Sequence, residues 1–126
     1  LDAGDILLQK PTPIGKRETS GELRTRLADL SGQALLEALA LIAKGKDKYV
    51  PQEHAKATRA PKIEKPDGVI TWNASAEVID RLVRAMTPKP GAQTRLGAKR
   101  FIVVQGEVEQ DFYGMGVPGG VGKGFL

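Results

Sequence analysis

The sequence predicts an α/β chain with two structured parts that are separated by a proline-rich linker. The first part, residues 1–45, combines a short apolar run with one long amphipathic helix. The second part, residues 67–126, combines a short strand, a second helix and a hairpin. Between them, residues 46–66 show no hydrophobic periodicity and contain three prolines, which is typical of an extended linker. We expect this linker to lie along the surface.

The opening stretch "LDAGDILLQ" predicts a bend followed by a strand. Ile6, Leu7 and Leu8 form a short apolar run of the kind that is buried on both faces of a sheet. A strand of this kind needs neighbours, and no residues upstream supply them. We therefore expect the opening to correspond to the middle of a domain.

The segment that follows predicts a helix from Thr19 to Lys44. "TSGE" is a capping box, in which Thr19 and Glu22 satisfy each other's backbone amides. Gly45 after Lys44 is a typical helix stop. The apolar residues recur at helical spacing, and we expect them to cover one face of a sheet; they are Leu23, Leu27, Leu30, Ala34, Leu35, Ala38, Leu39 and Ile42.

The second part begins with "VITW" at residues 69–72, which predicts a short strand whose Trp72 anchors a core. Ser75 is a helix cap, and Pro88 follows the end of the helix. The buried stripe of this helix is predicted to be Ile79, Leu82, Val83 and Met86. "AQTR" and "KRFIVV" then flank Gly97, which predicts a hairpin turn.

The composition excludes several classes of protein. The chain has 40% hydrophobic residues, enough for a modest core, and no cysteine, which excludes disulfides and thiolate chemistry. Its longest apolar stretch, "ALLEALALIA", is interrupted by Glu37 and is too short to span a membrane. Without a signal-peptide pattern, a cytoplasmic protein is expected.

The net charge of +4 is unevenly distributed along the chain. The basic residues of segment 81–100 have no acidic residue among them; they are Arg81, Arg84, Lys89, Arg95, Lys99 and Arg100. A second basic bias covers residues 44–62. Such a distribution suits a polyanionic partner, although a solvated basic surface is the commoner explanation.

Three further motifs bear on possible chemistry. The tail "GMGVPGGVGKG" ends in Gly-Lys but lacks the spacing and the Ser or Thr of a phosphate-binding loop. His54 is the only histidine and has no second metal ligand near it in the sequence, so no metal site is predicted. Asp2 and Asp5 bracket the opening bend, where composition alone makes them turn formers.

Four blocks of the sequence resemble the methionyl-tRNA formyltransferase family in order and spacing. They are "LDAGDILLQ", "ETSGELRTRLADLSGQALLEAL", "ATRAPKIEKPDGVITWNASAEVIDRLVRAM" and "TPKPGAQTRLGAKRFIV", and together they span roughly residues 1–104. The block "APKIEKPDGVITW" is the most specific. Formyltransferases that act on nucleotide sugars or on folate share the first block and match "APKI" less well.

The resemblance implies an architecture. Residues 1–45 would be the C-terminal edge of a Rossmann-like catalytic domain, and residues 67–126 an OB-like β-barrel domain that binds tRNA. Such a barrel needs about five strands, and only three can be counted, so the barrel is expected to be incomplete. Polar Arg59, Lys89 and Gln93 replace residues that are usually aromatic in the family.

The resemblance also implies the roles of individual residues. Asp2 matches the family's catalytic Asp, while the catalytic Asn and His and the site for 10-formyltetrahydrofolate would lie upstream. Lys62 and Lys65 match the lysines of the "K-x-x-K" linker block and are expected to contact tRNA phosphates. Arg81 and Arg84 lie three residues apart on one helix face, where they either reach phosphate or are simply solvated.

The expected function is formyl transfer to the amino group of methionyl-tRNA, with this chain supplying the tRNA-binding part and Asp2. The chain by itself is expected to be inactive. The parent protein is expected to be monomeric and cytoplasmic, or to lie in an organellar matrix in a eukaryote, without membrane contact. Two alternatives remain open: a formyltransferase for a nucleotide-linked amino sugar, and a non-catalytic basic RNA-binding module.

Overall fold

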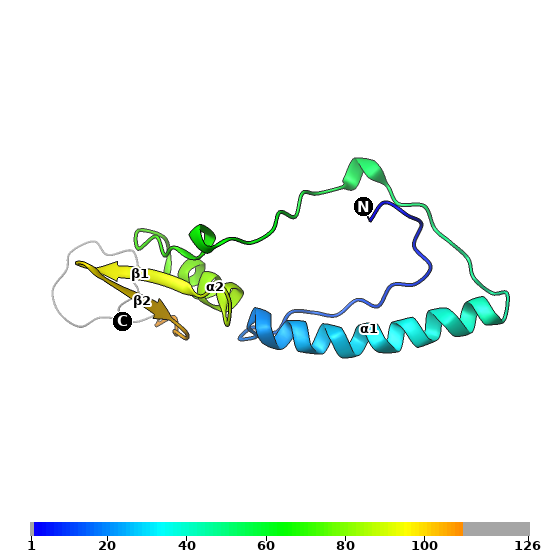
Figure 1. Cartoon of the computed structure of the whole chain (residues 1–126), viewed down its shortest axis with the longest axis horizontal. Coiled ribbons are helices and arrows are strands. Elements are labelled where there is room, and N and C mark those ends of the chain that lie inside the picture. Colours follow the sequence, from blue (N-terminus) through cyan, green and yellow to red (C-terminus); the bar gives the residue numbers. More distant parts are fainter. Residues whose placement is uncertain (1, 110–126) are drawn as a thin grey trace. The chain divides into compact units, whose positions relative to one another are not determined.

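The computed structural model describes residues 2–109, and the glycine-rich tail singled out above lies outside them (Figure 1). The helices are α1 (Ser20–Ala43) and α2 (Ala76–Met86), and the strands are β1 (Ala92–Leu96) and β2 (Lys99–Val103). Two 3-10 turns, η1 (His54–Lys56) and η2 (Lys65–Gly68), interrupt the predicted linker region. The described residues form two compact units. One unit contains the residues up to Gly15 together with Leu23–Pro61, and the other contains Lys16–Glu22 together with the residues from Lys62 onward.

In the first unit, the predicted opening strand is reduced to a single bridge. The amide of Ile6 donates to the carbonyl of Val50 at 2.8 Å, and the amide of Val50 donates to the carbonyl of Ile6 at 2.9 Å. Ile6, Leu7 and Leu8 are half-buried rather than buried. The prediction of a two-faced strand is wrong for the described residues, because they offer this run no further strand to pair with.

The ends of α1 confirm the local prediction. The Thr19 amide donates to Glu22 Oε2 at 2.8 Å, and the Glu22 amide donates to Thr19 Oγ1 at 3.3 Å, which completes the capping box. At the other end Gly45 has a φ of 62°, and the Lys46 amide donates to the Leu41 carbonyl at 2.9 Å. This is the left-handed glycine stop that closes a helix.

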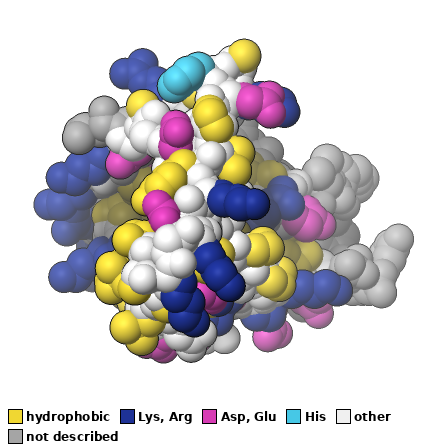
Figure 2. All heavy atoms as spheres, turned by 90° about the vertical axis from the view of Figure 1, so that its right-hand side faces the viewer, with side chains coloured by type: hydrophobic (Ala, Val, Ile, Leu, Met, Phe, Trp, Pro, Cys, Tyr) yellow, Lys and Arg dark blue, Asp and Glu magenta, His cyan; other side chains and the backbone are white. Residues whose placement is uncertain are grey.

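The apolar stripe of α1 is largely exposed. No residue of the helix is buried, and Leu35, Leu36 and Leu39 are 60%, 71% and 53% exposed. A space-filling view shows hydrophobic side chains lying at the surface among Lys and Arg side chains (Figure 2). The expectation that this helix covers a sheet is wrong for the described part of the chain, where no strand of its own unit is available to be covered.

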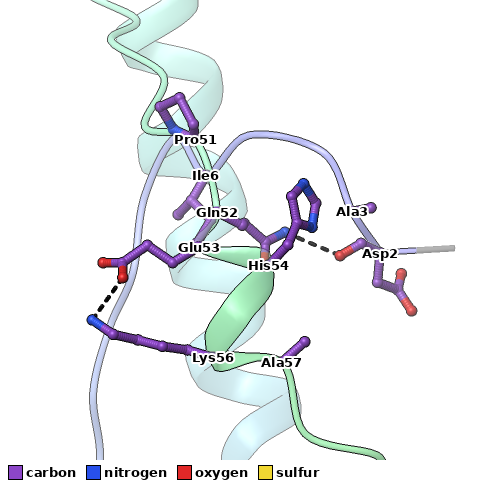
Figure 3. Close-up of a pocket in the computed structure, with 9 residues that line it drawn as sticks. All are labelled: Asp2, Ala3, Ile6, Pro51, Gln52, Glu53, His54, Lys56 and Ala57. Atoms are coloured by element: carbon purple, nitrogen blue, oxygen red, sulfur yellow. Dashed lines mark hydrogen bonds and ion pairs between the residues drawn. The ribbon is translucent and has the colours of Figure 1, made fainter.

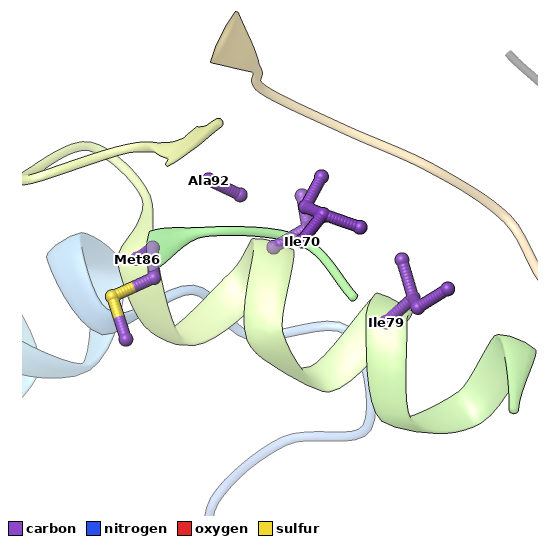
Figure 4. Close-up of a cluster of buried hydrophobic side chains, with 5 residues drawn as sticks. Ile70, Ile79, Met86 and Ala92 are labelled. Carbon is purple, nitrogen blue, oxygen red and sulfur yellow. The ribbon is translucent and has the colours of Figure 1, made fainter. Parts of the chain in front are cut away.

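The second unit contains the core. Its buried side chains are Ile70, Ile79, Val83, Met86 and Ala92, which come from α2, β1 and the segment just after η2 (Figure 4). Trp72 and Leu82 pack against this cluster from its edge. The Trp72 indole N–H donates to Thr94 Oγ1 at 2.7 Å, which satisfies the polar atom of a half-buried ring. The predicted core stripe of α2 and the anchoring role of Trp72 are confirmed.

The elements around this core follow the sequence closely. Ser75 Oγ accepts a hydrogen bond from the Val78 amide at 3.4 Å and caps α2. Strands β1 and β2 pair antiparallel around Gly97, whose φ is 59°. The predicted strand at residues 69–72 is shorter than expected, since only Val69 forms a bridge, parallel to Gln93. The described sheet therefore has two strands, extended at one side by a single bridge.

Gly68 and Gly91 bring η2 and β1 unusually close together. A Cβ atom at Gly68 would lie 2.4 Å from the carbonyl oxygen of Gly91, a separation that real Cβ atoms do not reach. Gly91 itself has a φ of 92°, a left-handed conformation that favours glycine. The backbone at the end of η2 is therefore in direct contact with the backbone just before β1.

Candidate functional site

Asp2 lies on a bend with left-handed backbone geometry. Its φ is 60°, which is uncommon for any residue other than glycine and is found disproportionately at functional sites. Its side chain is exposed. The sequence predicted a bend here, and the structure shows that Asp2 itself takes the strained position while Gly4 and Asp5 follow it.

Gln52 holds this bend from the opposite side. Its side-chain amide donates to the carbonyl of Asp2 at 3.0 Å and to the carbonyl of Gly4 at 2.7 Å (Figure 3). The bridge between Ile6 and Val50 lies next to this contact and brings the two segments together. Because both bonds go to backbone carbonyls, the carboxylate of Asp2 remains available. Sequence reasoning missed Gln52, since nothing local distinguishes it from its polar neighbours.

A shallow hollow adjoins the bend. It is lined by Asp2, Ala3, Ile6, Pro51, Gln52, Glu53, His54, Lys56 and Ala57 (Figure 3). His54 therefore lies in the same hollow as Asp2, which the sequence did not predict. Residues 2–109 contain no group of three His, Cys, Asp or Glu side chains that could hold a metal ion.

The predicted tRNA-contacting residues belong to the second unit. Lys62 and Lys65 are exposed at the end of the linker, with Lys65 opening η2. Arg81 is exposed on α2, one helical turn after Glu77. Hydrogen bonds from the Glu77 amide and with Ser75 lower the pKa of Glu77, and the charge of Arg81 contributes in the same direction. Arg81 otherwise faces solvent.

Arg84 is placed differently from Arg81. Its Nε donates to Asp80 Oδ2 at 2.9 Å, and its Nη1 donates to the carbonyl of Glu18 at 3.3 Å. Arg17 binds the other carboxylate oxygen of Asp80 at 3.0 Å, so Asp80 joins two arginines. The Arg84 side chain is only 18% exposed. The spacing of Asp80 and Arg84, four residues apart on a helix, is a sequence signal from which this pair could have been predicted.

Two hydrogen bonds to one backbone carbonyl also attach segment 16–22 to the end of α2. Ser20 Oγ donates to the Thr87 carbonyl at 2.6 Å, and the Gly21 amide donates to the same carbonyl at 3.1 Å. These bonds satisfy a carbonyl that the end of α2 would otherwise leave open. Together with Asp80 they make the entry to α1 part of the second unit.

Comparison with known families finds a match for most of the second unit. Residues 62–123 match the family described as "Formyl transferase, C-terminal domain". The match includes Lys62, Lys65, α2 and the β1–β2 hairpin.

Three relatives, each named methionyl-tRNA formyltransferase, narrow the class further. The protein from Marinobacter nauticus is 43% identical over 105 residues, which cover 83% of this chain and 34% of that protein. The protein from Acidovorax ebreus is 45% identical over 109 residues, or 86% of this chain and 34% of that protein. The protein from Syntrophus aciditrophicus is 40% identical over 124 residues, or 98% of this chain and 39% of that protein. The chain thus spans little more than a third of the length of these relatives.

No helix within residues 2–109 has the length and apolar character needed to cross a membrane.

Proposed function

We propose that this chain is part of an enzyme that transfers a formyl group from 10-formyltetrahydrofolate to the amino group of methionyl-tRNA. The observation that carries the proposal is the 40–45% identity, over most of this chain, to several proteins named for that activity. The match to the Syntrophus aciditrophicus protein covers 98% of this chain and therefore extends over both units.

Asp2 is proposed as the catalytic carboxylate. When an amine attacks a formyl carbon, a new C–N bond forms, the bond to the donor nitrogen breaks, and the amine must lose a proton. A carboxylate near that nitrogen can accept or relay the proton, or stabilise a cationic partner that does so. The left-handed bend and the two hydrogen bonds from Gln52 support this assignment, because they hold the backbone while leaving the carboxylate exposed. No residue of this chain is assigned to the formyl donor.

The second unit is proposed to bind the tRNA, with phosphate contacts from Lys62, Lys65 and Arg81. These three side chains are exposed and have no ion pair among the described residues. Phosphate contacts of this kind supply affinity and orientation rather than sequence information. Arg84 lies three residues after Arg81 on the same helix. We propose that it stabilises the fold next to the interface and does not contact phosphate, because its guanidinium group already binds Asp80 and the Glu18 carbonyl.

The finer architectural assignments also stand as proposals. Residues 1–45 would form the edge of a Rossmann-like catalytic domain, residues 46–66 the linker, and residues 67–126 an OB-like domain. The exposed apolar stripe of α1 supports the first assignment, because a helix at the edge of a larger domain presents such a face to it. We further propose a monomeric cytoplasmic enzyme whose substrate is the initiator tRNA.

The experiment is a formylation assay of the full-length protein that carries this chain, with Asp2→Asn and Asp5→Asn as a matched pair. Both residues are exposed on the same bend. Loss of a positioned proton-transfer group costs about 10²- to 10⁴-fold in rate, so Asp2→Asn should lower kcat by at least about 100-fold while Asp5→Asn changes it little. Formylation of a nucleotide-linked amino sugar in place of methionyl-tRNA, or no formylation at all, would contradict the proposal.

A further inference from the structure

The β1–β2 hairpin places two arginines directly opposite each other. In the antiparallel register Arg95 pairs with Arg100, just before the turn at Gly97. Directly opposed residues of an antiparallel pair have Cβ atoms about 5 Å apart on the same face, and like charges in that position are destabilising. The hairpin would be more stable with an acid at either position, so this pair calls for an explanation.

The pair lies on the solvent face of the hairpin. Side chains alternate between the two faces of a strand. Ala92 and Thr94 are buried, which places Arg95 on the opposite face together with Gln93. Arg100 shares that face because it opposes Arg95, and both arginines are exposed. Their guanidinium groups are therefore directed away from the core and open to a ligand.

The described residues supply no counterion for this pair. Every described ion pair lies elsewhere, as at Asp80, where one carboxylate serves both Arg17 and Arg84. Two opposed cations without an acid form a site that a dianionic or polyanionic ligand would stabilise, because the ligand removes the repulsion and gains two charge-assisted contacts.

Gln93 joins this face to the linker. Its side-chain amide donates to the carbonyl of Lys65 at 2.7 Å, and the Ile70 amide donates to the carbonyl of Gln93 at 2.9 Å. Gln93 thus ties η2, which begins at Lys65, to the strand face that also carries Arg95. The polar residue at a position expected to be aromatic has a structural role here, since it holds the backbone at Lys65 against the strand that carries Arg95.

We propose that Arg95 and Arg100 clamp an RNA phosphate between them, with Lys65 contacting a neighbouring phosphate of the same strand. The proposal rests on the proposed function and specifies how the second unit would hold its RNA. It predicts that the charge pair weakens the free hairpin and strengthens the complex. Gln93 is a positioning residue that acts by fixing Lys65.

The first test compares thermal stability with tRNA affinity, because the proposal predicts that one substitution changes them in opposite directions. Replacing Arg100 by Glu converts a repulsive cross-strand pair into an attractive one, so the Tm of the full chain should rise by a few degrees. The same substitution should weaken binding of tRNA at least tenfold at low salt. A residue with a purely structural role would not raise the Tm while it lowers the affinity.

The second arm measures the dependence of tRNA affinity on salt. Losing both contacts to this one phosphate lowers the slope of log K against log salt by about one unit, so the double variant Arg95→Gln/Arg100→Gln should show that change. Arg24→Gln/Lys44→Gln removes two exposed charges in and just after α1 and serves as the control, with a slope within about half a unit of the parent. Equal slopes for the hairpin variant and the parent would overturn the clamp.

The clamp and the proposed function fail in distinguishable ways. If the full-length protein formylates methionyl-tRNA but the hairpin variant binds with the parent's slope, the clamp alone is wrong. If neither the full-length parent nor the hairpin variant binds or formylates methionyl-tRNA, the proposed function is wrong, and so is the proposed clamp. A fall in Tm on Arg100→Glu would also overturn the clamp, because it would mean that the guanidinium stabilises the free fold.

Discussion

Gln52 links two segments that are 50 residues apart in the sequence, and its contacts make a sharp prediction at the scale of single residues. Both of its hydrogen bonds go to backbone carbonyls of the Asp2 bend, where φ is 60°. A strained backbone persists only when surrounding contacts hold it. The side-chain amide of Gln52 is such a contact, and it positions Asp2 without touching its carboxylate.

Replacing Gln52 by Ala in the full-length protein should therefore lower kcat for methionyl-tRNA by up to about 30-fold. Two hydrogen bonds contribute about 1 kcal/mol each, and about 1.4 kcal/mol is tenfold in rate. KM for tRNA should stay unchanged, because the bend lies outside the proposed phosphate contacts. Glu53→Gln is the control, since Glu53 makes only an exposed ion pair with Lys56. A rise in KM with an unchanged kcat would show that Gln52 does not position Asp2.

At the scale of elements, the contact between η2 and β1 depends on glycine. A Cβ atom at Gly68 would lie 2.4 Å from the carbonyl oxygen of Gly91, and the backbone there cannot rotate away as a flexible side chain would. The adjoining cluster of Ile70, Met86 and Ala92 would have to shift with it.

We expect Gly68→Ala to lower the free energy of unfolding of the second unit by about 2 kcal/mol or more. Urea denaturation followed by Trp72 fluorescence measures the change. Gly32→Ala is the matched control, because a Cβ atom at Gly32 meets nothing within 4 Å and Ala is the better helix former. Gly32→Ala should be neutral or stabilising. A stable Gly68→Ala variant would mean that η2 is not seated on β1 as described.

The capping box of α1 makes a prediction about pH. Hydrogen bonds from the Thr19 backbone and hydroxyl lower the pKa of Glu22 below its usual value of 4.5. A carboxyl whose pKa is lowered by folding stabilises the folded state above its unfolded pKa, and that contribution is lost as the pH falls through the folded pKa. The difference in Tm between the parent and Glu22→Gln should therefore be constant well above pH 4.5 and should shrink as the pH falls through the lowered pKa of Glu22. A constant difference down to about pH 3 would show that the cap does not depend on the charge.

At the scale of the whole molecule, the basic character of the second unit bears on how tRNA binds. Lys62→Ala/Lys65→Ala should weaken tRNA binding and lower the salt slope by up to about two units, one for each phosphate that is no longer neutralised. The Tm should hardly change, because both side chains are exposed. Preference for the initiator tRNA should survive, since phosphate contacts position rather than specify. Salt titrations of the parent, this variant and Lys44→Ala/Lys46→Ala measure the effect, and coincident curves for all three would exclude these lysines from the interface.

The sequence by itself determined the local elements of this protein. The Thr19–Glu22 box, the Ser75 cap, the glycine stop at Gly45 and the Gly97 turn all appear where their motifs indicate. Each of these signals is contained within a few neighbouring residues, so it acts before any tertiary contact forms. The buried face of α2 was also predicted correctly, because helical spacing alone determines which residues share a face.

Only the tertiary structure decided which charged and polar side chains are available. Arg81 and Arg84 look alike in sequence, yet Arg84 is engaged by Asp80 while Arg81 faces solvent. The contacts of Gln52 with Asp2 and of Arg17 with Asp80 join residues 50 and 63 positions apart. The short run at Ile6 became a single bridge because strand pairing requires partners, which local propensity does not supply. Availability of a side chain depends on what the folded chain brings next to it, and that is not a local property of the sequence.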